Sequence, residues 1–261
     1  MHSLHPRLRY PDLWRGCIFA PAPCLGPSGL RLHDNSGYGN HGTLTGLTPA
    51  QGWQINDGKY AMTFAGASQY VACGRVAEME NAKQFSASMW LRRTAASNTV
   101  SISKRTSGTN IFFLGFSAGV LFLAPINTNT NYGTYDLNDT KWHHAVMLFD
   151  GTQSSNETRL RLVLDGRETP LTYTGTVGAA MTSSTNNLLL SLTNVTYSTG
   201  SMDDIRLYNH VLSVTEAETL ASRRGIAYEM KPRSRSSIVV GAAFRPAWAS
   251  QRSQLIGGGI R

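Results

Sequence analysis

The sequence has few charged residues and no long apolar run. Asp, Glu, Lys and Arg together make up 15% of the 261 residues. A helix that crosses a membrane needs about 18 or more consecutive apolar residues, and no such run is present, so we expect no insertion into a membrane. The first residues, MHSLHPRLRYPDLW, are polar, basic and interrupted by proline. They lack the apolar centre of a secretory signal peptide, and we expect no signal peptide.

Cysteine is also scarce. The three cysteines, Cys17, Cys24 and Cys73, cannot all pair with one another, and their spacing does not match a metal site. We expect them to be buried or free thiols. The alternative is a disulfide between Cys17 and Cys24, because the short proline-rich loop between them can bring the two sulfur atoms together.

The net charge of +8 is concentrated at the two ends of the chain. Residues 1–33 hold four Arg and one Asp, and residues 223–261 hold eight basic residues and one Glu. Residues 34–222 hold 12 basic and 14 acidic residues, so the central part is nearly neutral. Basic ends usually bind something acidic. We expect partner proteins there and do not expect a nucleic acid.

Short alternations of apolar and polar residues dominate the chain from residue 41 onwards. In residues 85–93 (FSASMWLRR) every second side chain is apolar, which is the pattern of a strand with one face toward a core. The sequence Asp165-Gly166-Arg167 predicts a hairpin turn. The strands that we expect lie in residues 16–20, 41–46, 60–64, 69–74, 85–93, 99–104, 111–116, 120–126, 141–150, 158–166, 186–192 and 201–209.

Only residues 213–224 have the pattern of a helix, with Ser213 as N-cap and Glu216 completing a capping box. About a dozen strands and one short helix predict an all-β fold, a two-sheet antiparallel jelly-roll sandwich with extended terminal arms. We expect an N-terminal arm with the first strand in residues 1–33, the sandwich in residues 34–228 and a basic C-terminal arm in residues 229–261.

Four stretches, in this order, resemble the laminin-G-like, concanavalin A-like jelly-roll family of bacterial and viral proteins. They are HDNSGYGNHGTLTG (33–46), YAMTFAGASQYVACG (60–74), NDTKWHHAVMLFDG (138–151) with LRLVLDGRE (160–168), and GSMDDIRLYNHVLSVTEAETL (200–220). The resemblance implies a sandwich that serves as a binding or structural module. The chain departs from the family at residues 65–69 (AGASQ), where relatives often carry acidic residues.

The resemblance also implies a metal site. By resemblance, Asp34 and Asp204 lie close together and, with loop carbonyls near Gly39 and His41, hold a structural Ca²⁺, which prefers oxygen ligands. The alternative is that Asp34 caps a turn through its own backbone, and that Asp204 or its neighbour pairs with Arg206 or with a backbone N–H. No other cofactor is expected.

Tyrosines in Asn-, Thr- and Gly-rich loops are candidates for stacking on sugar rings. The glycan-binding candidates are Tyr132, Tyr135 and Tyr197, with Tyr173 as a further loop tyrosine. The alternative interpretation, which we favour, is that these loops are ordinary solvated turns.

Two motifs of enzymes occur in the wrong structural context. Residues 37–42 match G-x-G-x-x-G, but a strand pattern rather than a helix follows them. Ser117 lies in a G-x-S-x-G sequence between two strand patterns, so we expect a hairpin and not a nucleophile elbow. His143 and His144 are neighbours in a strand, and we expect one to point inward and the other to form a hydrogen bond at the surface.

Glycosidases need two carboxylates across a cleft. The Glu-x-Asp-x-x-Glu strand of sandwich glucanases is absent from the sequence. Glu78 and Glu80 lie in a loop pattern, and Glu216 and Glu218 lie on the predicted helix. We therefore expect a protein that is not an enzyme.

Two functions fit these observations. The first is a virion structural or accessory protein, similar to uncharacterised proteins of tailed phages, which reaches the outer surface of the particle without a signal peptide because lysis releases it. Its partners are then virion proteins and sister copies in a homo-oligomer. The alternative is a soluble, lectin-type module that binds a cell-surface glycan. The predicted partner-binding residues of the C-terminal arm are Arg233, Arg235, Phe244, Arg245 and Trp248.

Overall fold

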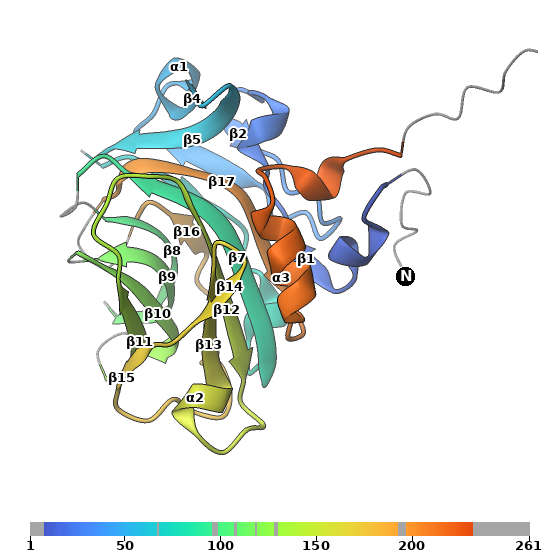
Figure 1. Cartoon of the computed structure of the whole chain (residues 1–261). Helices are drawn as coiled ribbons and strands as arrows, with labels where there is room; N and C mark the ends of the chain where they lie inside the picture. The colour runs from blue at the N-terminus through green and yellow to red at the C-terminus, as the bar shows by residue number, and fades with distance from the viewer. Residues whose placement is uncertain are drawn as a thin grey trace, which may run out of the picture. The chain divides into compact units, whose positions relative to one another are not determined.

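The computed structural model describes residues 8–231, except residues 67, 96–98, 107–108, 118, 128–129 and 193–196. In this part of the chain, two antiparallel sheets face each other, with α3 on the far side of one of them (Figure 1). The antiparallel two-sheet sandwich predicted from the sequence is therefore confirmed.

The first sheet has eight strands, and β17 lies near its middle. Its strands, in spatial order, are β14 (Arg167–Thr169), β13 (Leu160–Leu164), β12 (His143–Asp150), β7 (Gln84–Arg93), β17 (Thr199–Tyr208), β5 (Lys59–Ala65) and β4 (Trp53–Asn56), with β1 (Cys17–Phe19) paired to β17. The predicted hairpin turn joins β13 to β14, and both Asp165 and Gly166 have the positive φ angles that such a turn requires.

The second sheet has nine strands. In spatial order they are β15 (Thr172–Thr174), β11 (Asn131–Asp136), β10 (Val120–Asn127), β9 (Thr109–Ser117), β8 (Val100–Thr106), β16 (Leu188–Leu190), β6 (Tyr70–Ala72), β3 (Gly42–Thr45) and β2 (Arg31–Leu32). The pairing of Ser117 with Val120 places this serine at the end of the β9–β10 hairpin, so the G-x-S-x-G sequence has the context expected of it.

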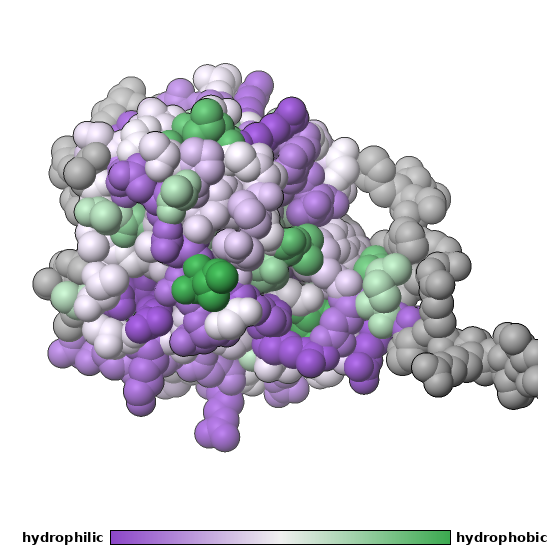
Figure 2. Space-filling view, turned by 90° about the horizontal axis from the view of Figure 1, so that it is seen from above, coloured by the Kyte–Doolittle hydropathy of each residue, from purple (hydrophilic) through white to green (hydrophobic). Residues whose placement is uncertain are grey.

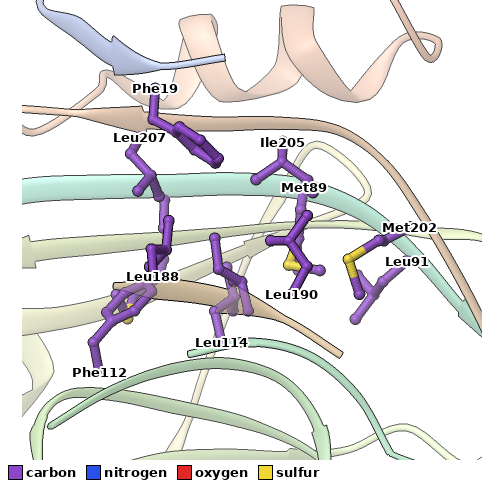
Figure 3. Packing of buried hydrophobic residues seen from close by; sticks show 14 of the residues in the cluster. Phe19, Met89, Leu91, Phe112, Leu114, Leu188, Leu190, Met202, Ile205 and Leu207 are labelled. Atoms are coloured by element: carbon purple, nitrogen blue, oxygen red, sulfur yellow. The ribbon is translucent and has the colours of Figure 1, made fainter. Parts of the chain in front are cut away.

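The main core lies between the two sheets. Alternate residues of β7 face it, as predicted for residues 85–93, and the paired residues of β12 face it with them. Figure 3 shows Met89 and Leu91 of β7 on one side and Leu188 and Leu190 of β16 on the other. Side chains from the two inner faces thus fill the space between the sheets, as in other sandwiches.

Helices are few and short. The predicted helix is α3 (Val214–Ala221), and Ser213 and Glu216 form its capping box as expected. The structure adds short helices that the sequence pattern did not indicate, because one turn of helix has too little periodicity to be recognised. They are α1 (Pro49–Gly52) and α2 (Asn156–Arg159), together with the 3-10 helices η1 (Pro11–Trp14), η2 (Pro23–Leu25), η3 (Ala77–Met79) and η4 (Ile226–Tyr228).

A second, smaller apolar cluster covers the outer face of the eight-stranded sheet. It joins Val146 and Leu148 of β12 to Leu220 of α3 and Leu13 of η1. The N-terminal segment, predicted as an irregular arm, thus packs on the sandwich from residue 8 onwards and contributes both β1 and β2. This packing follows from its apolar residues, among them Leu13, Ile18 and Phe19, which are buried.

The described residues contain no helix long and apolar enough to cross a membrane. Cys17, Cys24 and Cys73 are free thiols, so the structure has no disulfide between Cys17 and Cys24. Burial raises the pKa of Cys17 to about 11, which makes this thiol unreactive at neutral pH.

Candidate functional site

The two outer faces of the sandwich differ in how they are covered. The described helices pack on strands of the eight-stranded sheet: α3 on β12 to β14, α2 on β12 and β13, and α1 on β4 and β5. Figure 1 shows α3 on the side of this sheet that is turned away from β8 to β11. The described part of the chain thus has no helix packed on the outer face of the nine-stranded sheet, which we call the open face, although Ser101 and Ser103 of β8 on this face are fully buried.

Side-chain alternation decides which residues lie on this open face. In β9, Phe112 and Leu114 belong to the core, so Phe113 between them points to the outer face. In β10, Leu121 and Leu123 belong to the core, so Phe122 also points outward. Both phenylalanines thus lie on the face that has no helix over it.

Three aromatic rings meet there, and we call them the aromatic stack: Phe113, Phe122 and Tyr132. The rings of Phe122 and Tyr132 are stacked, with centroids 4.3 Å apart and an interplanar angle of 29°. The rings of Phe113 and Phe122 meet edge to face at 5.5 Å and 83°. Phe113 is buried, whereas Phe122 and Tyr132 are half-buried. The stack therefore offers ring surface to a ligand while its base is held in the sheet.

Threonine hydroxyls flank the aromatic stack at the edge of the sheet. The register of β11 and β15 places Thr134 opposite Thr172, and Tyr132 opposite Thr174. Residues that are directly opposite in an antiparallel pair share a face, so these hydroxyls lie beside the rings. The adjoining groove, of about 510 Å³, is lined by Thr134, Tyr135, Asp136, Pro170, Leu171 and Thr172.

The four tyrosines named from the sequence have different positions. Tyr132 belongs to the aromatic stack, and Tyr197 lies beside Tyr70, with ring centroids 6.5 Å apart. Tyr135 pairs with the core residue Leu121 and packs partly against the core, although it also lines the groove. The structure thus brings Tyr132 and Tyr197 to two separate aromatic pairs and places Tyr135 in neither.

Tyr173 has a structural contact. Its hydroxyl donates a hydrogen bond to the carbonyl oxygen of Leu160 at 2.8 Å, and burial raises its pKa. The tyrosine links the edge strand β15 to the other sheet, so it is not a candidate for stacking on a ligand.

Phe113 and Phe122 were missed by sequence reasoning. Both lie in apolar runs, IFFLGF and VLFLAPI, that predict buried strands. The available signal was that each phenylalanine occupies the position between two core residues, where a solvated sheet usually carries a polar side chain.

Asp34 joins the N-terminal segment to the loop before β3. Its Oδ1 accepts hydrogen bonds from the backbone N–H groups of Ala20 and Ser36, both at 2.9 Å. Its Oδ2 accepts a bond from the N–H of Asn40, also at 2.9 Å. This is the turn-capping role that the sequence offered as the alternative to metal binding.

Asp204 makes an ion pair with Arg206 inside the protein. The Oδ1 of Asp204 lies 3.0 Å from Nε of Arg206, and its Oδ2 accepts a bond from the N–H of Gly225 at 2.8 Å. The Arg206 guanidinium carbon lies 4.6 Å from the ring centroid of Trp14 and 4.7 Å from that of Tyr228. The pair thus connects β17 to Trp14 of η1 and to the segment of Gly225 and Tyr228.

Asp203 is buried beside this pair. Its Oδ1 accepts hydrogen bonds from the N–H groups of Cys24 at 2.9 Å and Asp204 at 2.7 Å. Burial and the nearby carboxylate of Asp204 raise the pKa of Asp203 to about 7. These two effects outweigh the attraction of the Arg224 guanidinium, whose Nη1 lies 3.7 Å from Oδ2 of Asp203. The carboxylate of Asp203, like that of Asp34, is therefore held by backbone N–H groups.

These arrangements do not fit a calcium ion at Asp34 and Asp204. The oxygens that would be its ligands already face N–H groups, and the Arg206 cation lies against Asp204. In the described part of the chain, no group of three or more His, Cys, Asp or Glu residues is arranged to hold a metal. Calcium at these residues stays a prediction, without support from their geometry.

Both histidines of β12 are buried, so the expectation that one lies at the surface is wrong. His143 lies between two carboxylates, with Nδ1 2.7 Å from Asp165 and Nε2 2.9 Å from Asp139. His144 points to the covered face, where its Nε2 lies 2.8 Å from Oγ of Ser88. The reason is that α3 and the N-terminal segment cover the outer face of the eight-stranded sheet, which the sequence pattern predicts to be solvated.

The predicted partner-binding residues, Arg233, Arg235, Phe244, Arg245 and Trp248, lie outside the described residues. Figure 2, which views the described chain from the end that carries α1 and β4, shows apolar residues as separate spots and not as a broad patch. The large apolar side chains that are exposed in the described part are Leu25, Leu30, Tyr38, Ile55 and Met230.

Comparison with known proteins extends this description. A family model described as the concanavalin A-like lectin/glucanases superfamily matches residues 65–218, which contain most strands of both sheets. No curated protein matches the sequence significantly.

Several solved structures have a similar fold. Domain 4 of AbnA, an extracellular GH43 arabinanase from Geobacillus stearothermophilus solved in complex with arabinotriose, matches with a TM-score of 0.57 at 14% identity, over 78% of this chain and 98% of that chain. The binding domain of botulinum neurotoxin DC, in complex with rat synaptotagmin II, matches with a TM-score of 0.57 at 12% identity, over 80% of this chain and 52% of that chain.

The same neurotoxin domain in complex with SialylT matches with a TM-score of 0.55 at 15% identity, again over 80% of this chain and 52% of that chain. This chain thus spans about half the length of the neurotoxin domains. At these identities the likeness shows the fold, and the concanavalin A-like sandwich expected from the sequence is confirmed.

Proposed function

Because this chain belongs to the concanavalin A-like lectin/glucanase superfamily, we propose that it is a carbohydrate-binding module and not an enzyme. The carbohydrate lies on the outer face of the nine-stranded sheet, over the aromatic stack. Of the two functions that the sequence suggested, this is the lectin-type one.

The aromatic stack carries the proposal. Sugar rings have apolar C–H faces that pack on aromatic rings, and hydroxyl groups around them that need hydrogen-bond partners. Phe122 and Tyr132 supply half-exposed ring surface, and the paired strands β11 and β15 supply the hydroxyls of Thr134 and Thr172 next to it. Binding sites for small ligands typically combine apolar walls with a few fixed polar groups in this way.

The similar structures support a ligand of this class. The arabinanase domain was solved with arabinotriose, and the neurotoxin binding domain was solved with SialylT. Those ligands belong to those proteins. They favour a glycan for this chain because the sandwich is shared and because its open face carries the aromatic stack.

Two of the acidic residues named from the sequence, Glu80 and Glu216, have structural contacts, which supports the absence of glycosidase activity. Glu80 is bonded by Arg75 at 2.6 and 2.5 Å and by Lys104 at 3.3 Å, and the Arg75 hydrogen bonds in particular lower its pKa to about 2. Glu216 caps α3 through its bonds to Ser213. A general acid needs a raised pKa, and Glu80 has the opposite.

A glycan array followed by titration calorimetry tests the proposal. The full-length protein should bind at least one oligosaccharide, and Phe122→Ala should weaken that binding. Ile55→Ala is the matched control, because Ile55 is an exposed apolar residue on β4 of the other sheet. Failure of the wild-type protein to bind any glycan, or equal binding by Phe122→Ala, would exclude the aromatic stack as a carbohydrate site.

The virion function stays a prediction. It depends on the basic C-terminal segment, whose residues lie outside the described chain. Association of the protein with purified particles, compared with that of a variant lacking residues 231–261, tests it. A virion protein can also bind a glycan, so the outcome does not decide the carbohydrate proposal.

A further inference from the structure

We propose that Asp136 selects the sugar: its carboxylate accepts hydrogen bonds from two neighbouring hydroxyl groups of a neutral sugar ring that lies on Phe122. This inference rests on the proposed carbohydrate function and names the class of sugar and the residue that selects it. It depends on the register of β10 and β11, on the exposure of their outer residues, and on the surroundings of the Asp136 carboxylate.

Asp136 lies on the same face as the aromatic stack and next to it. The register of β10 and β11 pairs Phe122 with Thr134 and Val120 with Asp136. Phe122 and Asp136 are therefore diagonal neighbours on one face, and such positions lie about 7–8 Å apart in an antiparallel pair. A sugar ring that stacks on Phe122 thus brings the hydroxyls at its rim within reach of the Asp136 carboxylate.

The accessible side of the aromatic stack is the side toward Asp136. Along the outer face of β10, Ala124 is 0% exposed, and its partner Phe113 in β9 is 2% exposed. In the other direction Val120 is half-buried, and Asp136 opposite it is exposed. A ligand therefore reaches the ring of Phe122 from the end of β11 that carries Asp136.

The groove beside the aromatic stack also lies at this end of β11. The pairing of β11 with β15 includes Thr134 and Thr172 but does not extend to Asp136 and Pro170. Residues on both sides of this point line the groove, whose volume is about 510 Å³. Sites for small ligands typically have volumes of about 300–1,000 Å³. Of the described residues that line the groove, Asp136 alone is charged.

The carboxylate of Asp136 is available to a ligand. Among the described residues, none donates a hydrogen bond to this carboxylate or forms an ion pair with it. By contrast, Oδ1 of Asp139 lies 2.9 Å from Nε2 of His143 and accepts a hydrogen bond from the N–H of Lys141 at 3.1 Å. Both oxygens of Asp136 can therefore accept hydrogen bonds from a bound sugar.

The charge of Asp136 decides the class of sugar. Hydrogen bonds to an ionised carboxylate are roughly twice as strong as those between neutral groups, and its two oxygens can accept from two adjacent hydroxyls at once. An acidic sugar would place a second negative charge beside Asp136, and the residues described as lining the groove include no Lys or Arg to offset it. The site therefore favours a neutral sugar with neighbouring hydroxyls.

An isosteric variant tests the inference. A glycan array that carries neutral oligosaccharides and their sialylated forms identifies the neutral oligosaccharide that binds best, and calorimetry with that oligosaccharide measures its affinity. Asp136→Asn keeps the shape of the side chain and removes its charge. It should weaken binding about tenfold and reduce the discrimination against the sialylated forms.

Glu218→Gln is the matched control. Glu218 is exposed on α3, which packs on the other sheet, and no described residue bonds its carboxylate. This variant should bind the same oligosaccharide as tightly as the wild-type protein. Thermal unfolding of both variants verifies that they are folded.

The outcomes separate this inference from the proposed function. Binding that Phe122→Ala weakens, but that Asp136→Asn leaves unchanged, would overturn the role of Asp136 and keep the carbohydrate function. A preference of the wild-type protein for sialylated glycans, or for glycans with a free amino group, would overturn the neutral sugar. No binding of any glycan by the wild-type protein would overturn the carbohydrate function itself.

Discussion

The ring of Tyr132 stacks on that of Phe122 with centroids 4.3 Å apart, and the pair lies on neighbouring strands of the open face. Tyr135 is only three residues further along β11, yet it faces the core side of the same sheet. The alternation of the strand thus gives two nearby tyrosines different roles, and this difference can be measured.

We expect Tyr132→Ala to weaken glycan binding and Tyr135→Ala to weaken the fold. Loss of a stacking aromatic at the centre of a site typically costs about 2 kcal/mol or more of binding free energy. Tyr135 packs partly against the core, so its truncation should lower the free energy of unfolding by about 1–3 kcal/mol. Titration calorimetry and urea unfolding of both variants check this pair. If Tyr135→Ala alone abolished binding in a stable protein, the site would lie in the groove and not over the aromatic stack.

The strands and their inward residues were predictable where one face is buried and the other solvated, as in residues 85–93. The same rule failed where both faces are buried. His144 and Val146 lie under a cover formed by α3 and the N-terminal segment, which are distant in sequence. The aromatic stack was not predictable either, because it needs the register between β9, β10 and β11, and sequence alternation does not determine which strands become neighbours.

Residues 203–206 show a similar limit. The sequence made Asp204 a candidate metal ligand or a partner of Arg206, and it could not decide between them. What decides is the position of Trp14 and Tyr228, whose rings enclose the guanidinium of Arg206. Both aromatic residues come from segments outside the sheets, and local sequence around Arg206 carries no information about them.

Removing one member of the Asp204–Arg206 pair should destabilise the fold strongly. Both side chains are almost fully buried, and breaking a buried ion pair leaves an unpaired charge, which typically costs about 3–5 kcal/mol. We therefore expect this loss of unfolding free energy for Arg206→Met, measured by urea denaturation. The double variant Asp204→Asn with Arg206→Met should recover part of it. A loss below about 1 kcal/mol for the single variant would mean that water or another group compensates the carboxylate.

Metal removal should leave the stability unchanged. The carboxylate oxygens of Asp34 face backbone N–H groups, and Asp204 faces Arg206. We expect the same thermal midpoint in EDTA as in excess calcium, by scanning calorimetry. A ligand that binds only the folded state, at a concentration one hundred times its Kd, adds about 2.7 kcal/mol to the free energy of unfolding, and a calorimeter resolves the resulting shift easily. A rise in the midpoint with calcium that is lost in Asp34→Asn would support the calcium hypothesis instead.

Acid should weaken the fold partly through His144. Burial lowers the pKa of this histidine to about 4, because the covered face does not solvate an imidazolium ion. As the pH falls below the ordinary histidine pKa of about 6.5, the unfolded chain binds a proton that the folded protein does not, and the unfolding free energy falls by at most about 1.4 kcal/mol per pH unit. His144→Gln keeps a polar group that can bond to Ser88 and removes this titration.

The test is the difference in unfolding free energy between wild type and His144→Gln, measured from about pH 7 down to about pH 5. Other groups titrate in both proteins, so the difference isolates His144. It should shrink as the pH falls. For His143→Asn we expect the opposite dependence of the unfolding free energy on pH. The hydrogen bonds that His143 donates to Asp165 and Asp139 outweigh the burial that opposes them, so the pKa of His143 is raised, and its contribution is present in acid and lost as the pH rises through that pKa. Parallel pH curves for wild type and His144→Gln would show that His144 accepts a proton in the folded protein, and hence that the covering segments admit water.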